Sequence, residues 1–129
     1  LREFLALGVP ASKLVVGLPF YSYEYVGFLG KTPIVSFQRH LREISSLLRD
    51  DSWTHHFDNS SQTPYLQKGM GLGMRQVWYD DPRSISAKIA SAKNMGMSLS
   101  GCWTADSLDY RAGAPIGANL YWQALEIMP

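Results

Sequence analysis

Two short apolar segments constrain the fold of this chain more than any other feature. Residues 13–21 (Lys-Leu-Val-Val-Gly-Leu-Pro-Phe-Tyr) form a continuous apolar run that ends in aromatic side chains. Its length and β-branched content predict a buried strand of the kind found in parallel sheets. Residues 99–103 (Leu-Ser-Gly-Cys-Trp) predict a second buried strand, which carries the large aromatic side chain of Trp103 at its end.

Two helices are predicted around the second strand. Asp81 is placed to cap a helix whose first residue is Pro82 and which stops at Gly96. A closing amphipathic helix follows a loop through Pro115 and Gly117. The expected apolar faces are Ile85, Ile89 and Ala92 in the first helix, and Leu120, Tyr121, Ala124, Leu125 and Met128 in the second.

The segment from 32 to 48 is also predicted to be a helix. Thr32 is placed to cap it and Pro33 fits its first turn. His40 lies on the opposite side from the apolar residues, which makes it a solvent-facing helix residue. The apolar residues recur at spacings of three and four, and they are Ile34, Phe37, Leu41, Ile44 and Leu48.

Residues 50–74 are polar and rich in turn-forming residues. Their Gly69-x-Gly71-x-Gly73 run has the look of a nucleotide-binding loop, but it lacks the preceding strand and following helix that such a loop needs. We therefore expect a hairpin or an adaptable loop, followed by a strand over residues 75–79.

The order of these elements is typical of an α/β barrel. Residues 1–5 read as the last turns of a helix that Gly8 ends, with Pro10 just beyond, and the first residue is Leu1 rather than methionine. Because such a barrel needs about 250 residues, we expect these 129 residues to hold only its last part and to begin within the fold.

Composition excludes several classes of function. A net charge of +1 gives no reason to expect nucleic acid or a membrane surface as partner, and the apolar runs are far shorter than a bilayer span of roughly 20 residues. The three histidines are scattered, and the single cysteine forms neither an internal disulfide nor a zinc site. We expect no metal and no cofactor.

Three segments, in this order, resemble glycoside hydrolase family 18, the chitinases and their relatives. Residues 8–21 are similar to the segment of the seventh barrel strand, residues 76–86 (Gln-Val-Trp-Tyr-Asp-Asp-Pro-Arg-Ser-Ile-Ser) to the entry of the seventh helix, and residues 101–103 to the eighth strand. The second segment, Trp103 and residues 108–110 are most similar to the di-N-acetylchitobiase branch.

The resemblance implies a fold and an activity. The chain would supply the seventh and eighth strand–helix units of a (β/α)8 TIM barrel, with residues 22–78 as a small α+β insertion between the seventh strand and the seventh helix. The implied reaction is hydrolysis of β-1,4-linked N-acetylglucosamine oligosaccharides by a substrate-assisted, retaining route, for which this family is a known case. The family's acidic motif, Asp-x-x-Asp-x-Asp-x-Glu, does not occur in these 129 residues.

The resemblance also assigns three substrate-binding residues and no catalytic one. Trp103 matches the tryptophan that forms the floor of the subsite for the distorted sugar, a role that suits the broad apolar face of an indole. Tyr21 matches a tyrosine at the end of the seventh strand, whose hydroxyl can hydrogen-bond a substrate. Tyr23 stands where chitinases usually have an arginine, which leaves the sugar contact open there.

Other polar and aromatic residues have structural interpretations. Asp81 is explained as a helix cap, and Asp80 as a brace for the same turn. Trp78 is expected to pack in the core or within the insertion, and Cys102 to be a small buried side chain. Asp106 and Asp109 follow the second strand, where barrel loops carry function.

Localisation rests on two clues. The resemblance points to a lysosomal or secreted protein, and Asn59-Ser60-Ser61 is a possible glycosylation sequon. Such triplets often occur by chance, so an unmodified Asn59 is an equally good interpretation. Chitobiases have a cysteine where this chain has Ser107, so no disulfide forms in that loop and the lysosomal assignment is weaker.

Three hypotheses remain open at this point. The first is a glycosidase of chitobiase type, and the second is a chitinase-like lectin with the same cleft but no catalytic glutamate. The third is that the 129 residues exist alone. In that case unpaired strand edges predict aggregation or a swapped oligomer, and we expect no hydrolysis of chitobiose.

Overall fold

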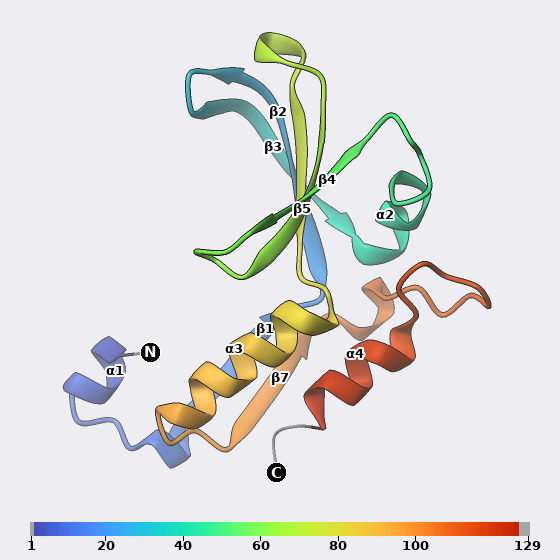
Figure 1. The fold of residues 1–129 in the computed structure, drawn as a ribbon. Helices are drawn as coiled ribbons and strands as arrows, with labels where there is room; N and C mark the ends of the chain where they lie inside the picture. Colours follow the sequence, from blue (N-terminus) through green and yellow to red (C-terminus); the bar gives the residue numbers. More distant parts are fainter. Residues whose placement is uncertain (1, 127–129) are drawn as a thin grey trace.

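The computed structural model describes residues 2–126, which form two regions joined at one end (Figure 1). The first region is a pair of parallel strands, β1 (Val15–Pro19) and β7 (Leu99–Trp103), in register from Val15 opposite Leu99 to Pro19 opposite Trp103. It also holds helices α1 (Arg2–Ala6), α3 (Pro82–Asn94) and α4 (Ala118–Leu125). Both apolar segments are thus confirmed as strands of a parallel pair. The predicted burial is wrong for most of their residues, since only Leu18 of β1 and no residue of β7 is buried.

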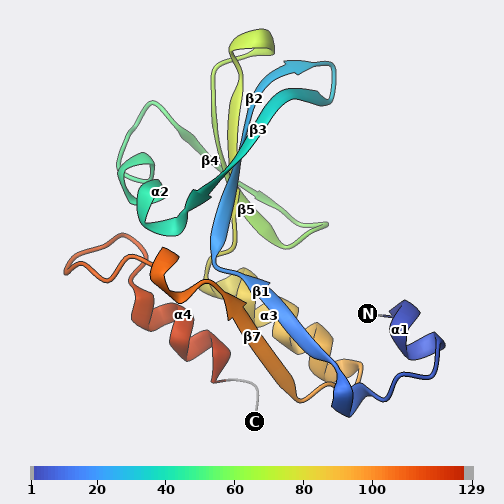
Figure 2. The ribbon, with the colours of Figure 1, turned by 180° about the vertical axis from the view of Figure 1, so that it is seen from behind.

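Helices α3 and α4 lie on the same side of the β1–β7 pair, as the two opposite views show (Figures 1 and 2). On the face of β1 toward these helices, Leu18 is buried and Val16 partly buried, and both belong to the core cluster that holds Ile85 and Ile89 of α3. On the other face Val15 and Leu99 are about half exposed, at 56% and 48%. The strand pair therefore has one packed face and one open face within the described residues.

The second region is a five-stranded antiparallel sheet in the order β3-β2-β6-β5-β4. Helix α2 (Leu41–Leu47) lies beside it and buries Leu41 and Ile44. Only one residue, Phe20, separates β1 from β2, so the two regions are joined directly. The strands are β2 (Tyr21–Leu29), β3 (Thr32–His40), β4 (Thr54–Asp58), β5 (Thr63–Lys68) and β6 (Arg75–Tyr79).

The helix predicted over 32–48 is wrong in its first half. Residues 32–40 form β3, which pairs with β2 along its whole length, and only α2 is helical. Ile34 and Phe37 are exposed, Ile34 by 54%, so their spacing from Leu41 does not mark one apolar face. β-Branched Ile34 and Val35 favour the strand, and cross-strand pairing overrides the accidental helical period. His40 ends the strand, and its Nδ1 is buried with no hydrogen-bond partner among residues 2–126.

Helix α3 follows the prediction closely. Asp81 and Ser84 form a capping box, with the Ser84 amide donating to Asp81 Oδ1 at 2.8 Å and Pro82 in the first turn. Gly96 ends it in the left-handed conformation at φ +80°. The predicted apolar face, Ile85, Ile89 and Ala92, is fully buried.

The remaining predicted elements are confirmed with small differences. In α4, Tyr121 and Ala124 are buried but Leu120 is exposed, and Met128 lies outside the described residues. The glycine run joins β5 to β6 as the expected hairpin loop. Gly69 has φ +75°, and a Cβ there would lie 2.5 Å from the Gly73 carbonyl oxygen, so this turn requires glycine.

Candidate functional site

The carboxyl ends of β1 and β7 meet where the two regions join, and Trp103 lies at this point. It is the last residue of β7 and its side chain is 71% exposed. The Phe20 amide donates to the Trp103 carbonyl oxygen at 2.6 Å, so parallel pairing continues to the start of β2. The Trp103–Thr104 peptide bond is cis. Trp103 is therefore held by its backbone while its indole stays free.

Tyr21 and Tyr23 lie next along β2, on one face of the five-stranded sheet together with Tyr25. The Tyr21 and Tyr23 rings meet edge to face with centroids 5.8 Å apart, and the Tyr23 and Tyr25 rings stack at 6.1 Å. Tyr23 is 39% exposed and Tyr21 is half-buried. The structure thus brings the three predicted binding residues to one end of the β1–β7 pair.

An aromatic row crosses the same face of the sheet. Strand register places Trp78 of β6 opposite both Tyr23 and Tyr65, and His56 opposite Tyr65. Trp78 stacks on Tyr65 with centroids 4.3 Å apart, and Tyr65 stacks on His56 at 4.8 Å. Trp78, expected in the core or in packing within the insertion, packs on Tyr65 but lies outside the core.

Two hollows lie on this face, and Tyr25 and Trp78 line both of them. The first, about 220 Å³, is also lined by Pro19, Tyr21, Tyr23, Asp80 and Lys88. The second, about 310 Å³, is also lined by Phe28, Pro33 and Gln76. Tyr21, Tyr23 and Tyr25 alternate along β2, a pattern in the sequence that is able to mark this surface, whereas Trp78 joins it only through strand pairing.

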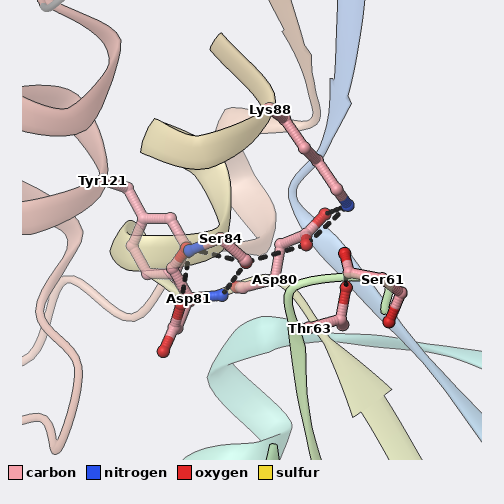
Figure 3. A network of polar contacts seen from close by, with 7 residues as sticks. All are labelled: Ser61, Thr63, Asp80, Asp81, Ser84, Lys88 and Tyr121. Atoms are coloured by element: carbon pink, nitrogen blue, oxygen red, sulfur yellow. Dashed lines mark hydrogen bonds and ion pairs between the residues drawn. The ribbon is translucent and has the colours of Figure 1, made fainter. Parts of the chain in front are cut away.

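Asp80, which also lines the first hollow, anchors the junction between β6 and α3 (Figure 3). Its buried carboxylate accepts from Lys88 Nζ at 2.6 and 2.5 Å and from Ser84 Oγ at 2.8 Å, and the Tyr121 hydroxyl donates to its carbonyl oxygen at 2.8 Å. Burial, together with the nearby Asp81 carboxylate, raises the pKa of the neighbouring Tyr79 to about 12. Asp80 is therefore fully engaged as a brace, as predicted.

Asp109 and Asp106, in the segment that follows β7, differ sharply. Asp109 is buried, and the Arg111 guanidinium, which hydrogen-bonds it at 2.7 Å, holds its pKa well below the usual range, with help from Ser45. Asp106 is exposed, and its carbonyl oxygen accepts from Arg42. Asp109 thus ties this segment to α2.

The described residues hold no cluster of His, Cys, Asp and Glu able to bind a metal ion. Cys102 is partly rather than fully buried, and burial raises the pKa of its thiol. Within residues 2–126, no helix is long and apolar enough to cross a bilayer. The chemistry of this surface is therefore that of aromatic faces, hydroxyls and one neutralised ion pair.

Comparisons with known proteins place this geometry in context. The family model described as glycosyl hydrolases family 18 matches residues 1–107. Di-N-acetylchitobiase of Rattus norvegicus is 30% identical over 130 residues, which cover 84% of this chain and 34% of the rat protein. The chain spans about a third of the length of the chitobiases it matches.

Solved structures share the fold. A group IV chitinase of Ostrinia furnacalis in complex with allosamidin superposes with a TM-score of 0.76 at 22% identity, over 98% of this chain and 38% of that chain. Human YKL-39, described as a pseudo-chitinase with retained chitooligosaccharide binding properties, gives 0.74 at 20% identity, over 97% and 38%. Both an enzyme and a binding protein therefore carry this arrangement of strands and helices.

Proposed function

The chain belongs to glycosyl hydrolase family 18, and from this premise we propose that the protein hydrolyses β-1,4-linked N-acetylglucosamine oligosaccharides of chitobiose type. The observation that carries the proposal is the exposed indole of Trp103 at the carboxyl end of β7, where Tyr21 and Tyr23 follow β1 at the same end of the parallel strand pair. Barrel enzymes place their active sites at that end of the strands.

The proposal includes the barrel. Strands β1 and β7 would be its seventh and eighth strands, and residues 22–78 the insertion between the seventh strand and seventh helix. The open face of the pair, with Val15 and Leu99 half exposed, supports this because further barrel strands would bury those side chains.

In the proposed mechanism this chain binds and orients the sugar. Trp103 offers its flat face to the C–H side of the pyranose, and the Tyr21 hydroxyl donates or accepts a hydrogen bond beside it. The acetamido carbonyl of the substrate would attack the anomeric carbon, and a glutamate would protonate the leaving oxygen. That glutamate would come from sequence outside these 129 residues, because they contain no Asp-x-x-Asp-x-Asp-x-Glu motif.

The test is kinetic. Protein made from the complete coding sequence is expected to cleave N,N′-diacetylchitobiose. Trp103→Ala is expected to lower kcat/KM by at least tenfold, while Leu120→Ala, at an exposed position of α4, leaves it unchanged. Equal rates for the parent and Trp103→Ala would contradict the proposed role of the indole. The 129-residue chain alone is expected to show no turnover.

A chitooligosaccharide-binding protein without activity is the second candidate. The human YKL-39 structure favours it, because a protein of this fold is described as retaining binding as a pseudo-chitinase. Sequencing the position of the family's glutamate in the complete gene separates the two candidates. Binding of chitobiose by calorimetry with no released N-acetylglucosamine would establish the lectin.

We also propose a secreted or lysosomal location. The Asn59 sequon lies in the exposed turn between β4 and β5, where the Ser61 amide and hydroxyl both donate to Asp58 Oδ2. Protein from a secretory host is expected to lose mass on N-glycanase treatment, and Asn59→Gln to abolish that loss. A product of unmodified mass would remove this support.

A further inference from the structure

Ser107 is a fully buried serine in the segment after β7, and its side chain supports a helix of the other region. The Ser107 hydroxyl oxygen accepts from the Leu41 amide, the first amide of α2, at 2.9 Å. His40, at the N-cap position of α2, makes no capping hydrogen bond with its side chain. The first amides of a helix have no partner within the helix and need an acceptor from outside it. Ser107 supplies that acceptor from 66 positions away along the chain.

Ser107 is also tied to the residue that follows Trp103. It ends a short 3-10 turn, Ala105–Ser107, and its amide donates to the Thr104 carbonyl oxygen at 3.0 Å. The segment after β7 passes beside α2 in both opposite views (Figures 1 and 2). The start of α2 is therefore connected to Trp103 through one serine side chain and one short turn.

The start of α2 is connected to Tyr21 as well. His40 is the register partner of Tyr21 in the β2–β3 pair, and Leu41 follows it directly. Tyr21 in turn follows Phe20, whose amide donates to the Trp103 carbonyl oxygen at 2.6 Å. The two residues proposed to bind the sugar thus lie in one closed ring of contacts.

The closure of this ring depends on a single side chain. The ring leaves Trp103 through Phe20 and Tyr21 and returns through Leu41 and Ser107. Its links are covalent bonds, strand pairing and backbone hydrogen bonds, except for the Ser107 hydroxyl. A closed ring restricts both the distance and the angle between Tyr21 and Trp103, whereas an open ring keeps only the connection through Phe20.

We propose that Ser107 is a positioning residue, which holds Tyr21 and Trp103 in the arrangement that lets one sugar contact both. This inference rests on the proposed function and adds to it a residue that does not itself touch the sugar. The physical basis is preorganisation, because a site whose groups are already in place loses less entropy on binding. Small misplacements of such groups by distant substitutions are costly.

The experiment compares two buried serines that both tie the segment after β7 to α2. Ser107→Ala opens the ring, whereas Ser45→Ala removes the 2.5 Å hydrogen bond from the Ser45 hydroxyl to Asp109, outside the ring. The serines are 0% and 4% exposed, so both variants leave a buried group without its partner and should lower the melting temperature by comparable amounts. Affinity for thio-linked di-N-acetylchitobiose, whose sulfur linkage resists hydrolysis, is then measured by calorimetry well below both melting temperatures, in protein made from the complete coding sequence.

The two variants are expected to differ in affinity. Ser107→Ala should weaken binding of the disaccharide by at least fivefold, and Ser45→Ala by less than twofold. In a Tyr21→Phe background there is no Tyr21 hydroxyl to align with Trp103, so Ser107→Ala should then cost less than twofold, because residues that act together are not additive. Should Ser107→Ala fail to fold, Ser107→Cys takes its place in both comparisons, because a thiol is a weak acceptor.

Two results would overturn the positioning role. Equal losses of affinity in the Ser107 and Ser45 variants would mean that destabilisation alone explains both. An undiminished effect of the Ser107 substitution in the Tyr21→Phe background would mean that Ser107 does not act through the arrangement of Tyr21 and Trp103. In either case, weaker binding by Trp103→Ala leaves the proposed function standing. Failure of the parent protein to bind the disaccharide overturns both proposals.

Discussion

The two sheets of this protein differ in how their faces are covered. The five-stranded sheet buries one face against α2 and covers much of the other with its own stacked rings, Trp78 on Tyr65 and Tyr65 on His56. The β1–β7 pair buries one face under α3 and α4 and leaves the other open, with Leu99 and Trp103 exposed. The aromatic face of the five-stranded sheet is thus partly covered by its own side chains, whereas the open face of the strand pair is not.

The two sheets also differ in what holds their tryptophan side chains, Trp78 and Trp103, in place. Trp78 is fixed by neighbours on its own sheet, so its orientation depends on strand register. Trp103 is fixed only through its backbone, by pairing with β1 and by the Phe20 amide. Two properties decide this comparison: whether the two regions stabilise each other, and whether exposed Trp103 contributes to binding without contributing to folding.

The largest effect is expected at the joint between the regions. Phe20 is fully buried and packs edge to face on Tyr121 at 5.3 Å and on Trp122 at 5.9 Å. Phe20→Ala should lower the free energy of unfolding by about 3–5 kcal/mol, because it leaves a cavity between the strand pair and α4. Urea denaturation measures this loss, and Phe20→Leu should cost much less. A split into two separate transitions in the parent protein would show that the regions unfold independently.

A smaller loss is expected inside the five-stranded sheet. Glu24 is completely buried and forms ion pairs with Arg39 and Arg75. Glu24→Gln should lower the free energy of unfolding by about 2–3 kcal/mol, because two guanidinium groups lose their anion while staying partly exposed to water.

The matched control is Glu43→Gln. Glu43 is exposed and lies 3.7 Å from Arg39, so removing its charge should cost about 0.5 kcal/mol or less. Similar losses for the two variants would mean that the second region does not rely on its buried ion pairs.

The origin of β3 shows why sequence reasoning reached one region more completely than the other. In the first region the decisive features are local: the apolar runs of β1 and β7, the Asp81 cap, and Gly96 at the end of α3. In the second region they are not local. The helical spacing of Ile34 and Phe37 gives way to pairing with β2, and Trp78 meets Tyr65 only through the β5–β6 register.

The residues of the candidate site also differ in how far the sequence predicts them. Trp103 and Tyr21 follow from motifs that can be read along the chain, and the structure places them at one strand end. The hollows beside Trp78 need three strands in register before any of their residues face one another. Alternation in β2 points to Tyr25, but nothing in the sequence alone pairs it with Trp78.

A pH-dependent effect is expected at the second contact between the regions. Asp109, after β7, accepts from Ser45 of α2 at 2.5 Å and is paired with Arg111, and its pKa is lowered in the folded protein. A carboxylate whose pKa is lower in the folded than in the unfolded protein stabilises the fold at any pH above its unfolded pKa, which is near 4. This contribution is lost as the pH falls through the folded pKa.

Asp109→Asn should therefore lower the free energy of unfolding by about 1–3 kcal/mol at pH 7. The difference in the free energy of unfolding between parent and variant should decrease steadily below about pH 4. Urea denaturation at pH 7, 5, 4 and 3 measures it, with exposed Asp106→Asn as the control, which should leave the free energy of unfolding unchanged at pH 7. A gap that stays constant from pH 7 to pH 3 would contradict the assignment of this stability to the Asp109 carboxylate.

The smallest effect on stability is expected at Trp103, and it is the one that sharpens the comparison most. Because the side chain is 71% exposed and pairing uses only the backbone, Trp103→Ala should change the free energy of unfolding by no more than about 0.5 kcal/mol. The buried Trp53, at 4% exposure in the other region, provides the contrast, since Trp53→Ala should cost about 3–5 kcal/mol. If Trp103→Ala destabilises the protein as much as Trp53→Ala does, the indole is part of the folded core, and its place as a free sugar platform is lost. A stable variant that no longer binds diacetylchitobiose instead assigns the open side of the strand pair to the ligand.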